Sequence, residues 1–247
     1  SMTMGLSLKR MKIPKVLYID TMIFRLLFIS LIAINISSNE IKEYEARYSY
    51  DTEEISIKGI RKLEKINQDY VLSFNARNML AKMSFISTFS MENENITTKN
   101  YEIKIRPKFI KRDQQISFDY ENKLLSSLGR HLWSKDLDLY TKAFDPLNAQ
   151  IQIRSNLLRG MKEFSIQLVE IKNGEIEENF YSIDSEQVCV NNDKKYNCLV
   201  LKRLRKEEGR ETLYFVAPEL DYMFLKIIDT GPKRIQTLEL IEILSFG

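Results

Sequence analysis

The chain has 247 residues, of which 44% are hydrophobic and 29% charged, and its 37 Lys and Arg against 34 Asp and Glu give a formal net charge of +3. Residues 1–38 hold five of the bases and one of the acids, which leaves 32 bases and 33 acids in residues 39–247. A body so close to neutrality gives no electrostatic reason to expect a nucleic-acid partner. Its length suits one sizeable domain.

The N-terminal region contains a pattern typical of export signals. A short lead with one positive charge, residues 22–25, precedes an apolar run, residues 26–36, in which only Ser30 and Asn35 are polar. This run is shorter than the roughly 20 residues that a membrane-spanning helix needs. Its order matches the charged lead and apolar core of a secretory signal peptide, so the sequence predicts an exported protein.

This interpretation divides the chain into an N-terminal extension with a signal peptide, residues 1–38, and a single β-rich envelope domain, residues 39–247. Two other interpretations stay open. An uncleaved leader would anchor the protein in the inner membrane, and an apolar run of this length also suits a buried core helix. Ile36 occupies a place where a small residue is preferred before cleavage, and Met22 offers a later start codon.

Beyond residue 38, apolar and polar residues alternate with a period of two, which is the pattern of strands with one buried face. The alternation recurs in residues 44–50, 70–76, 81–91, 101–105, 116–120, 164–168 and, with one break at Glu242, 238–246. Short polar turns, such as residues 172–174, separate these segments. The predicted fold is therefore mainly β, an antiparallel meander curled into an open or half β-barrel.

One helix interrupts the predicted strands. Asp145 precedes Pro146, the preferred pairing of a helix cap with proline at the first helical position, and Gly160 offers a stop. These signals predict a central helix over about residues 146–159 that packs on or over the concave face of the barrel. Residues 124–140 suit either a short helix or a long loop.

The only two cysteines, Cys189 and Cys198, flank a run of turn-forming residues, 191–195. A turn centred between Asp193 and Lys194 would place them directly opposite each other in a hairpin, within reach of a disulfide. An oxidising compartment would allow that bond to form. A pair of reduced thiols is the alternative, and the spacing does not suit a zinc site.

The sequence carries little that points to catalysis. Its one histidine, His131, has no neighbouring nucleophile motif, and there is no phosphate-binding glycine loop. We therefore expect no catalytic residues, no metal site and no cofactor. The basic run at residues 202–206 is interpreted as a solvated strand end, with contact to an anionic lipid headgroup or a partner as the alternative.

Aromatic residues are the more promising resource, because a curved sheet has a concave face on which an apolar pocket forms. Arg154 on the central helix is a candidate for a polar contact, either to a ligand headgroup or to backbone near Asp145. Core packing is the alternative role for every aromatic residue at strand spacing. The candidates for ligand contact are Phe74, Phe85, Phe89, Tyr101, Trp133, Phe144, Phe215 and Tyr222.

Residues 144–154, Phe-Asp-Pro-Leu-Asn-Ala-Gln-Ile-Gln-Ile-Arg, resemble the Asp-Pro-Leu…Leu-Arg signature of the bacterial envelope family filed as domain of unknown function 3108. Residues 214–222 are similar to that family's aromatic-x-Ala-Pro segment, and residues 44–59 and 186–203 resemble it more weakly. The resemblance implies a periplasmic protein with no established activity. The family also looks distantly similar to the half-barrels that carry lipoproteins and hold acyl chains on their concave side.

These observations together predict a non-enzymatic exported envelope protein that binds or carries a lipid or another apolar ligand in a half-barrel near the membrane. Each buried methylene of an acyl chain would supply about 0.8 kcal/mol of affinity. The alternative is a protein-interaction or scaffolding module of the periplasm that has a packed interior and meets another envelope protein through a sheet edge or its convex face.

Overall fold

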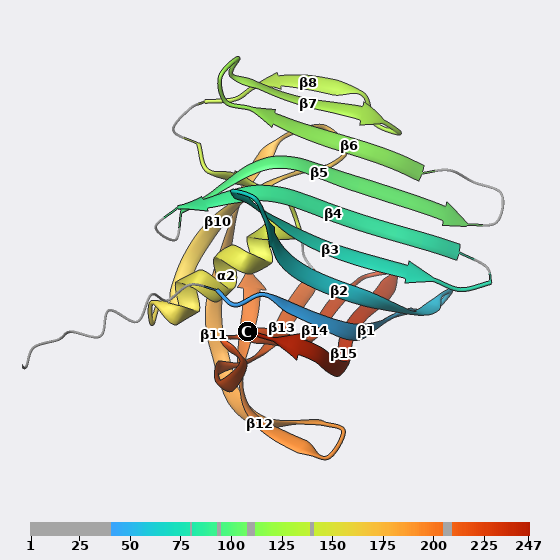
Figure 1. The fold of residues 1–247 in the computed structure, drawn as a ribbon, viewed down its shortest axis with the longest axis vertical. Coiled ribbons are helices and arrows are strands. Elements are labelled where there is room, and N and C mark those ends of the chain that lie inside the picture. The colour runs from blue at the N-terminus through green and yellow to red at the C-terminus, as the bar shows by residue number, and fades with distance from the viewer. Residues whose placement is uncertain (1–40, 80, 93–94, 108–111, 139–140, 205–208) are drawn as a thin grey trace, which may run out of the picture. The chain divides into compact units, whose positions relative to one another are not determined.

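The computed structural model describes residues 41–79, 81–92, 95–107, 112–138, 141–204 and 209–247. These residues form a mainly β fold with one α-helix, α2 (Asn148–Leu158), and one short 3-10 helix, η1 (Pro218–Leu220) (Figure 1). The predicted fold class, an open and mostly antiparallel barrel-like sheet with a central helix, is confirmed. The leader, residues 22–38, lies outside the described residues.

The strands form one 15-stranded sheet in the order β8-β7-β6-β5-β4-β3-β2-β1-β15-β14-β13-β12-β11-β10-β9. Neighbours are antiparallel except for β9 and β10, which run parallel. The last strand pairs with the first, so two meanders meet at the β1–β15 ladder. The strands are β1 (Tyr44–Thr52), β2 (Ser56–Ile66), β3 (Asp69–Arg77), β4 (Ala81–Glu92), β5 (Asn95–Pro107), β6 (Arg112–Asp119), β7 (Leu124–Gly129), β8 (Trp133–Asp136), β9 (Ala143–Phe144), β10 (Glu163–Val169), β11 (Ile176–Asn191), β12 (Lys194–Leu204), β13 (Glu211–Ala217), β14 (Met223–Gly231) and β15 (Arg234–Phe246).

Alternation along the strands decides which face of the sheet is dry. In β3, for example, Tyr70, Leu72, Phe74 and Ala76 are buried, and the residues between them are more exposed. Because successive side chains point to opposite faces, each such strand turns one apolar row inward. These inward rows form one continuous hydrophobic core.

The break in alternation at Glu242 has a structural cause. The β1–β15 ladder contains two register shifts, one between Glu45 and Ala46 and one between Arg47 and Tyr48. Each shift is a β-bulge, which inserts a residue into one strand and moves the following side chains to the other face. Glu242 pairs with Arg47 between the two bulges, and an ion pair joins their side chains.

The sheet curls until its two edges come close without forming a ladder. From β5, the hydroxyl of Thr98 donates a hydrogen bond to the backbone oxygen of Ala143 in β9 at 2.8 Å. From β8, the indole nitrogen of Trp133 donates to the backbone oxygen of Ile171 at 2.9 Å. Gly174 lies so close to this ring that an added Cβ would stand 2.6 Å from it, so the seam needs glycine at that position.

The helix α2 lies within the curl, at the end opposite the C-terminal ends of β3 and β5 (Figure 1). Its N-terminus is capped as the sequence predicts. The side chain of Asp145 accepts hydrogen bonds from the backbone nitrogens of Leu147 (2.7 Å) and Asn148 (3.0 Å). Pro146 follows the cap, where its missing N–H costs no helical hydrogen bond.

The predicted disulfide between Cys189 and Cys198 is present, with Cα atoms 5.8 Å apart. The turn lies one residue earlier than predicted, at Asn192 and Asp193, so Cys198 pairs in register with Gln187 and the bond runs diagonally. Asn192 has a positive φ of 52°, a conformation that asparagine tolerates better than most residues and that fits this place in a tight hairpin turn.

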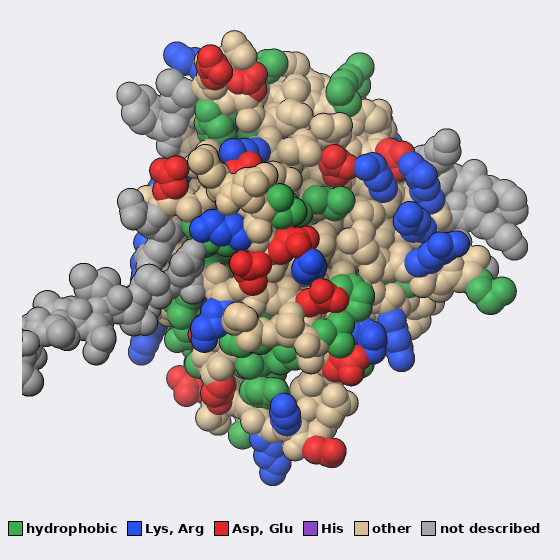
Figure 2. Space-filling view, viewed as in Figure 1, with side chains coloured by type: hydrophobic (Ala, Val, Ile, Leu, Met, Phe, Trp, Pro, Cys, Tyr) green, Lys and Arg blue, Asp and Glu red, His purple; other side chains and the backbone are tan. Residues whose placement is uncertain are grey.

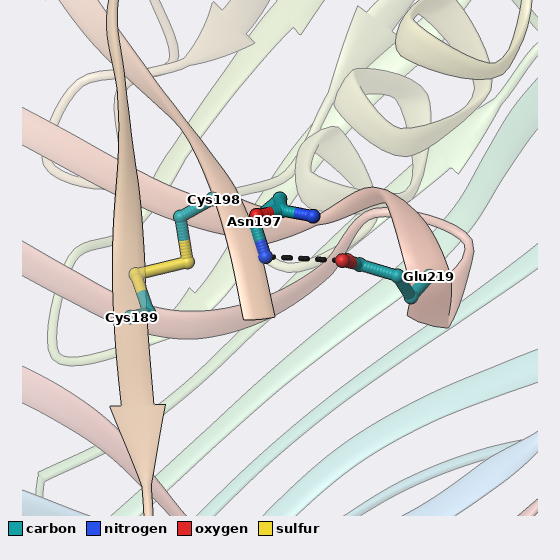
Figure 3. Close-up of a disulfide and its surroundings, with 4 residues drawn as sticks. All are labelled: Cys189, Asn197, Cys198 and Glu219. Carbon is teal, nitrogen blue, oxygen red and sulfur yellow. Dashed lines mark hydrogen bonds between the residues drawn. A yellow bond between two sulfur atoms is a disulfide. The ribbon is translucent and has the colours of Figure 1, made fainter. Parts of the chain in front are cut away.

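The β11–β12 hairpin is tied to the rest of the sheet at two further points. The backbone nitrogen of Asn197 donates to a carboxylate oxygen of Glu219 in η1 at 3.0 Å (Figure 3). The side chain of Asn192 donates to the backbone oxygen of Ile241 in β15 at 2.9 Å. The tip and one strand of the hairpin are thus hydrogen-bonded to β15 and η1.

Residues 124–140, for which helix and loop were both open, instead contribute strands β7 and β8. Residues 139–140 are not described. Neither of the described helices is both long and apolar enough to cross a bilayer.

Candidate ligand-binding cavity

The curled sheet encloses a cavity of about 630 Å3. Its walls come from β1–β5 on one side and β10–β15 on the other, and residues of α2, including Ala149 and Ile153, line it as well. This volume lies within the 300–1,000 Å3 that is usual for small-molecule sites. The cavity therefore has the size of a ligand site and is lined by both meanders.

The middle of the cavity is apolar on both walls. On one wall Phe74, Phe85 and Ile103 stand side by side, because each pairs in register with the next across β3, β4 and β5. The rings of Phe74 and Phe85 stack with their centroids 6.5 Å apart. On the other wall, across β13, β14 and β15, the row of Tyr214, Ile227 and Leu238 faces the same space.

Two residues further along these strands, the wall of β12–β15 becomes polar. We call this end of the cavity, where the lining residue Arg234 is exposed, the mouth, and the end beside α2 the floor. Arg203, Thr212, Asp229 and Gln236 pair in register across these four strands and all line the cavity. We call these four residues the polar row. The hydroxyl of Thr212 donates to Asp229 at 2.6 Å. On the opposite wall, Met83 and Ile105 lie two residues from Phe85 and Ile103, and this wall stays apolar.

The floor beside α2 holds a buried cation, Arg61, of which only 1% is exposed. Its Nε donates to the hydroxyl of Tyr44 and its Nη2 to the side-chain oxygen of Gln150, both at 2.8 Å. The guanidinium also lies 5.8 Å from the ring centroid of Tyr48. Both hydrogen-bond partners are neutral, and Arg61 forms no ion pair with any described carboxylate.

A second buried arginine, Arg154, lies behind the floor and is not among the lining residues. Its Nε donates to the backbone oxygen of Asp221 at 2.9 Å, and its guanidinium lies 5.3 Å from the ring centroid of Tyr44. Nη1 and Nη2 have no hydrogen-bond partner among the described residues. Burial lowers the pKa of Arg154, since the charged form loses its hydration.

The N-terminus of α2 is held by a fully buried polar cluster. Besides the two backbone nitrogens, the carboxylate of Asp145 accepts a hydrogen bond from the hydroxyl of Ser87 in β4 at 2.6 Å. The side chain of Asn148 donates to Thr98 in β5 at 2.8 Å. Burial raises the pKa of Asp145 to about 7, although these hydrogen bonds act in the opposite direction. Burial raises the pKa of Tyr101, and the negative charge of Asp145 raises it further.

The structure places three of the predicted ligand-contact residues, Phe74, Phe85 and Tyr101, on the cavity lining. The other six lie elsewhere. Phe89 is fully buried and stacks on Tyr70, Phe144 is buried in the edge strand β9, and Trp133 ties β8 to the loop after β10. Phe215 is next to the lining residue Tyr214 in β13, so it lies on the opposite face of the sheet. Tyr222 follows η1. Arg154 contacts the backbone at Asp221 rather than near Asp145.

Several lining residues were outside the sequence prediction, among them Arg61, Tyr181, Ile227, Leu238 and Arg234. The alternation of β14 and β15 was the available signal for Ile227 and Leu238, but nothing in the sequence says which wall a strand joins. His131 lines the mouth, and hydrogen bonds with the side chain of Gln114 hold its backbone nitrogen and oxygen in place.

No family model matches the chain, and no curated protein matches it. Among solved structures, it is similar to a beta-barrel-like protein of the domain of unknown function DUF1849 from Brucella abortus. The two share 8% sequence identity and a TM-score of 0.55, over 83% of this chain and 98% of that one. At this identity the likeness shows a β-barrel-like fold of uncharacterised function, and it does not extend to the domain of unknown function 3108.

Proposed function

We propose that this protein binds a lipid or another apolar ligand inside the curled sheet and catalyses no reaction. The observation that carries the proposal is the cavity of about 630 Å3 with apolar rows on both walls. Removing apolar ligand surface from water would supply the affinity, at about 0.8 kcal/mol for each methylene. The described lining residues include one histidine, His131, and neither serine nor cysteine, which favours binding over nucleophilic catalysis.

The proposal includes export to the periplasm, with the body near or peripheral to a membrane. The signal-like pattern of residues 22–38 supports it, and so does the bonded pair Cys189 and Cys198, because disulfides persist in oxidising compartments. The likeness of residues 144–154 to the domain of unknown function 3108 agrees with this placement. Mass spectrometry of the mature protein from the envelope tests it, since a mature N-terminus near Ser38 is expected and an intact leader in the cytoplasm would contradict it.

Binding is tested by filling the cavity. Ile227 and its neighbour Ile228 are both half-buried in β14, but only Ile227 lines the cavity. We expect Ile227→Trp to weaken binding of the neutral apolar dye N-phenyl-1-naphthylamine about tenfold, because the larger ring occupies the ligand's space. Ile228→Trp is the matched control and should bind the dye as the wild type does. Equal binding by both variants, or no binding by the wild type, would reject the proposal.

A second candidate function, protein interaction, is favoured by an unpaired strand edge. β10 pairs with β11 only as far as Ser182, so within the described residues 184–191 of β11 pair on one side alone, with β12. Val188 and Val190 in this edge are 60% and 63% exposed. A long exposed edge with apolar side chains is a template for pairing with another strand.

The partner that this edge fits is a second copy of the same strand. In an antiparallel pair centred on Val188, Glu186 would face Val190 of the other copy, and no two acids would oppose each other. Sedimentation of the wild type should then show a dimer that Val188→Lys with Val190→Lys converts to a monomer. A wild type that stays monomeric at high concentration would argue against this second function.

A further inference from the structure

The charged residues that line the cavity are mostly cations, although the body as a whole is close to neutral. One cation, Arg61, lies at the floor and the others lie toward the mouth. The charged lining residues are Arg61, Arg130, Lys172, Arg203 and Arg234 against Glu170 and Asp229. Low-dielectric walls lined by one sign of charge focus the field and raise the local concentration of oppositely charged ligands. The cavity is therefore suited to a ligand that is anionic as well as apolar.

Asp229, the acid of the polar row, forms no ion pair with either Arg203 or Arg234 among the described residues. Asp229 pairs with Arg210 at 3.1 Å and accepts the hydroxyl of Thr212. Arg203 donates from both Nε, at 2.8 Å, and Nη2 to the neutral side-chain oxygen of Asn179, which leaves Nη1 free of any bond to a described residue. Arg203 and Arg234 form no ion pair with any described residue, although both line the mouth. Two guanidinium groups thus stand at the polar side of the mouth without a counter-charge in the part of the chain that the structure describes.

We propose that Arg203 and Arg234 form a headgroup subsite, and that the ligand is an acyl chain that ends in a carboxylate. This inference rests on the proposed function and names its ligand class. The acyl chain of the ligand lies along the apolar rows of Phe74 and Ile227. Its carboxylate lies at the polar row, since guanidinium groups match carboxylates in charge and geometry. The ladder register itself produces this arrangement, because polar and apolar rows follow each other at two-residue steps along β12–β15.

The buried Arg61 is the competing place for the headgroup, and its surroundings disfavour it. Only 1% of Arg61 is exposed, whereas Arg203 is half-buried and Arg234 is exposed. A carboxylate at the floor would lose its hydration and gain a contact with one cation only. A carboxylate at the mouth keeps water on one side and still meets two cations. The ligand therefore enters tail first, with the tail toward α2.

The experiment uses the full protein chain and compares two probe ligands with 16 carbons each, palmitate and its neutral analogue 1-hexadecanol. Each displaces N-phenyl-1-naphthylamine from the wild type at pH 7.5 and low salt. We expect palmitate to bind about tenfold more tightly than hexadecanol, because it alone gains charge-assisted hydrogen bonds. Added salt should reduce this preference, since the subsite lies at the solvent edge.

The variants test which cations cause the preference. Arg203→Gln with Arg234→Gln should bring the two probes to within about twofold of each other without weakening hexadecanol. Lys202→Gln with Lys233→Gln is the matched control, because these neighbours carry the same charge and do not line the cavity. Arg203→Lys with Arg234→Lys should restore part of the preference, which separates loss of charge from loss of fold.

The outcomes separate this inference from the function on which it rests. Equal affinities of palmitate and hexadecanol for the wild type, or a preference that survives removal of both arginines, would overturn the headgroup subsite and leave apolar binding intact. A preference lost equally in the lysine control would overturn it too, since a general surface charge would then explain it. Failure of the dye and both probes to bind the wild type would reject the apolar-ligand function itself.

Discussion

Two buried ionisable side chains differ sharply in their hydrogen bonding: Asp145, just before α2, and Arg154, within it. The carboxylate of Asp145 accepts three hydrogen bonds, from Ser87 and from two backbone nitrogens at the start of the helix. The guanidinium of Arg154 makes one hydrogen bond, to a backbone oxygen, and leaves two nitrogens without a partner among the described residues. Both side chains are at most 1% exposed.

The difference shows which of the two positions the sheet depends on. Asp145 joins β4 to the helix through bonds that only an acceptor at this place can satisfy, so its burial is compensated. Arg154 offsets its lost hydration through one hydrogen bond and the ring of Tyr44, and a cation over a ring is a weaker substitute for water than a set of hydrogen bonds. We therefore expect the first position to be sensitive to substitution and the second to be tolerant.

The largest effect should appear in the pH dependence of stability. Burial raises the pKa of Asp145 from 3.8 to about 7, so the folded protein holds this proton more tightly than the unfolded chain. Below about pH 4 Asp145 is protonated in both the folded and the unfolded state, so its titration does not change the free energy of unfolding. Between about pH 4 and pH 7 only the unfolded chain releases the proton, so the free energy of unfolding falls as pH rises. The difference between the two pKa values corresponds to about 4 kcal/mol.

Asp145→Asn isolates this contribution, because the amide keeps the shape and an acceptor oxygen but does not titrate. Urea unfolding between pH 4 and pH 8 should show the variant gaining on the wild type as pH rises. A difference between the two proteins that stays flat over this range would mean that Asp145 is ionised throughout, and that hydrogen bonding outweighs burial.

The next effect is loss of the cap itself. Asp145→Ala removes the acceptor of two backbone nitrogens and of Ser87, and it should cost about 3 kcal/mol of the free energy of unfolding at pH 5. Asp145→Asn under the same conditions should cost less than about 1 kcal/mol, since its oxygen still accepts from the backbone. Equal losses in the two variants would show that the charge, not the cap, holds the helix.

A smaller effect is expected at Ser87, which bonds Asp145 from β4. Ser87→Ala should cost about 1.5 kcal/mol, and because this hydrogen bond lowers the pKa of Asp145, the cost should be greater at pH 8 than at pH 4. Ser84→Ala is the matched control on the same strand, where the hydroxyl donates to neutral Asn75 at 2.7 Å. Its cost should not change with pH, and a pH-independent cost at Ser87 would separate that residue from the titration.

More of the fold than of the candidate site could be predicted from the sequence. Alternation and turn residues predict the meander, and the pair Asp145 and Pro146 predicts the helix within two residues of its observed start, because these signals are local. The cavity depends on long-range register. Arg203 and Gln236 lie in one row only because β13 and β14 pair in register between their strands, and no local pattern reveals that β15 joins β1.

The same limit explains the missed and displaced residues. Phe89 and Phe144 share the spacing and apolar character of Phe74, and only the packing of neighbours decides that they are covered while Phe74 meets the cavity. Residues 124–129 and 133–136 pair as strands although their pattern is weakly periodic, because β6 offers an edge to β7, and β7 then offers one to β8. Edge availability is a property of the assembled sheet and not of the segment.

The smallest effect, and the one of opposite sign, belongs to Arg154. Replacement by Met keeps the length and apolar stem of the side chain and removes a buried charge that the described residues pair only in part. Arg154→Met should therefore leave the free energy of unfolding unchanged or raise it by about 1 kcal/mol, because loss of the bond to Asp221 is offset by the desolvation no longer required. Urea unfolding at pH 7 measures this. A loss greater than about 2 kcal/mol would show that the contact with Tyr44 outweighs desolvation, and the fold would then depend on Arg154 as it does on Asp145.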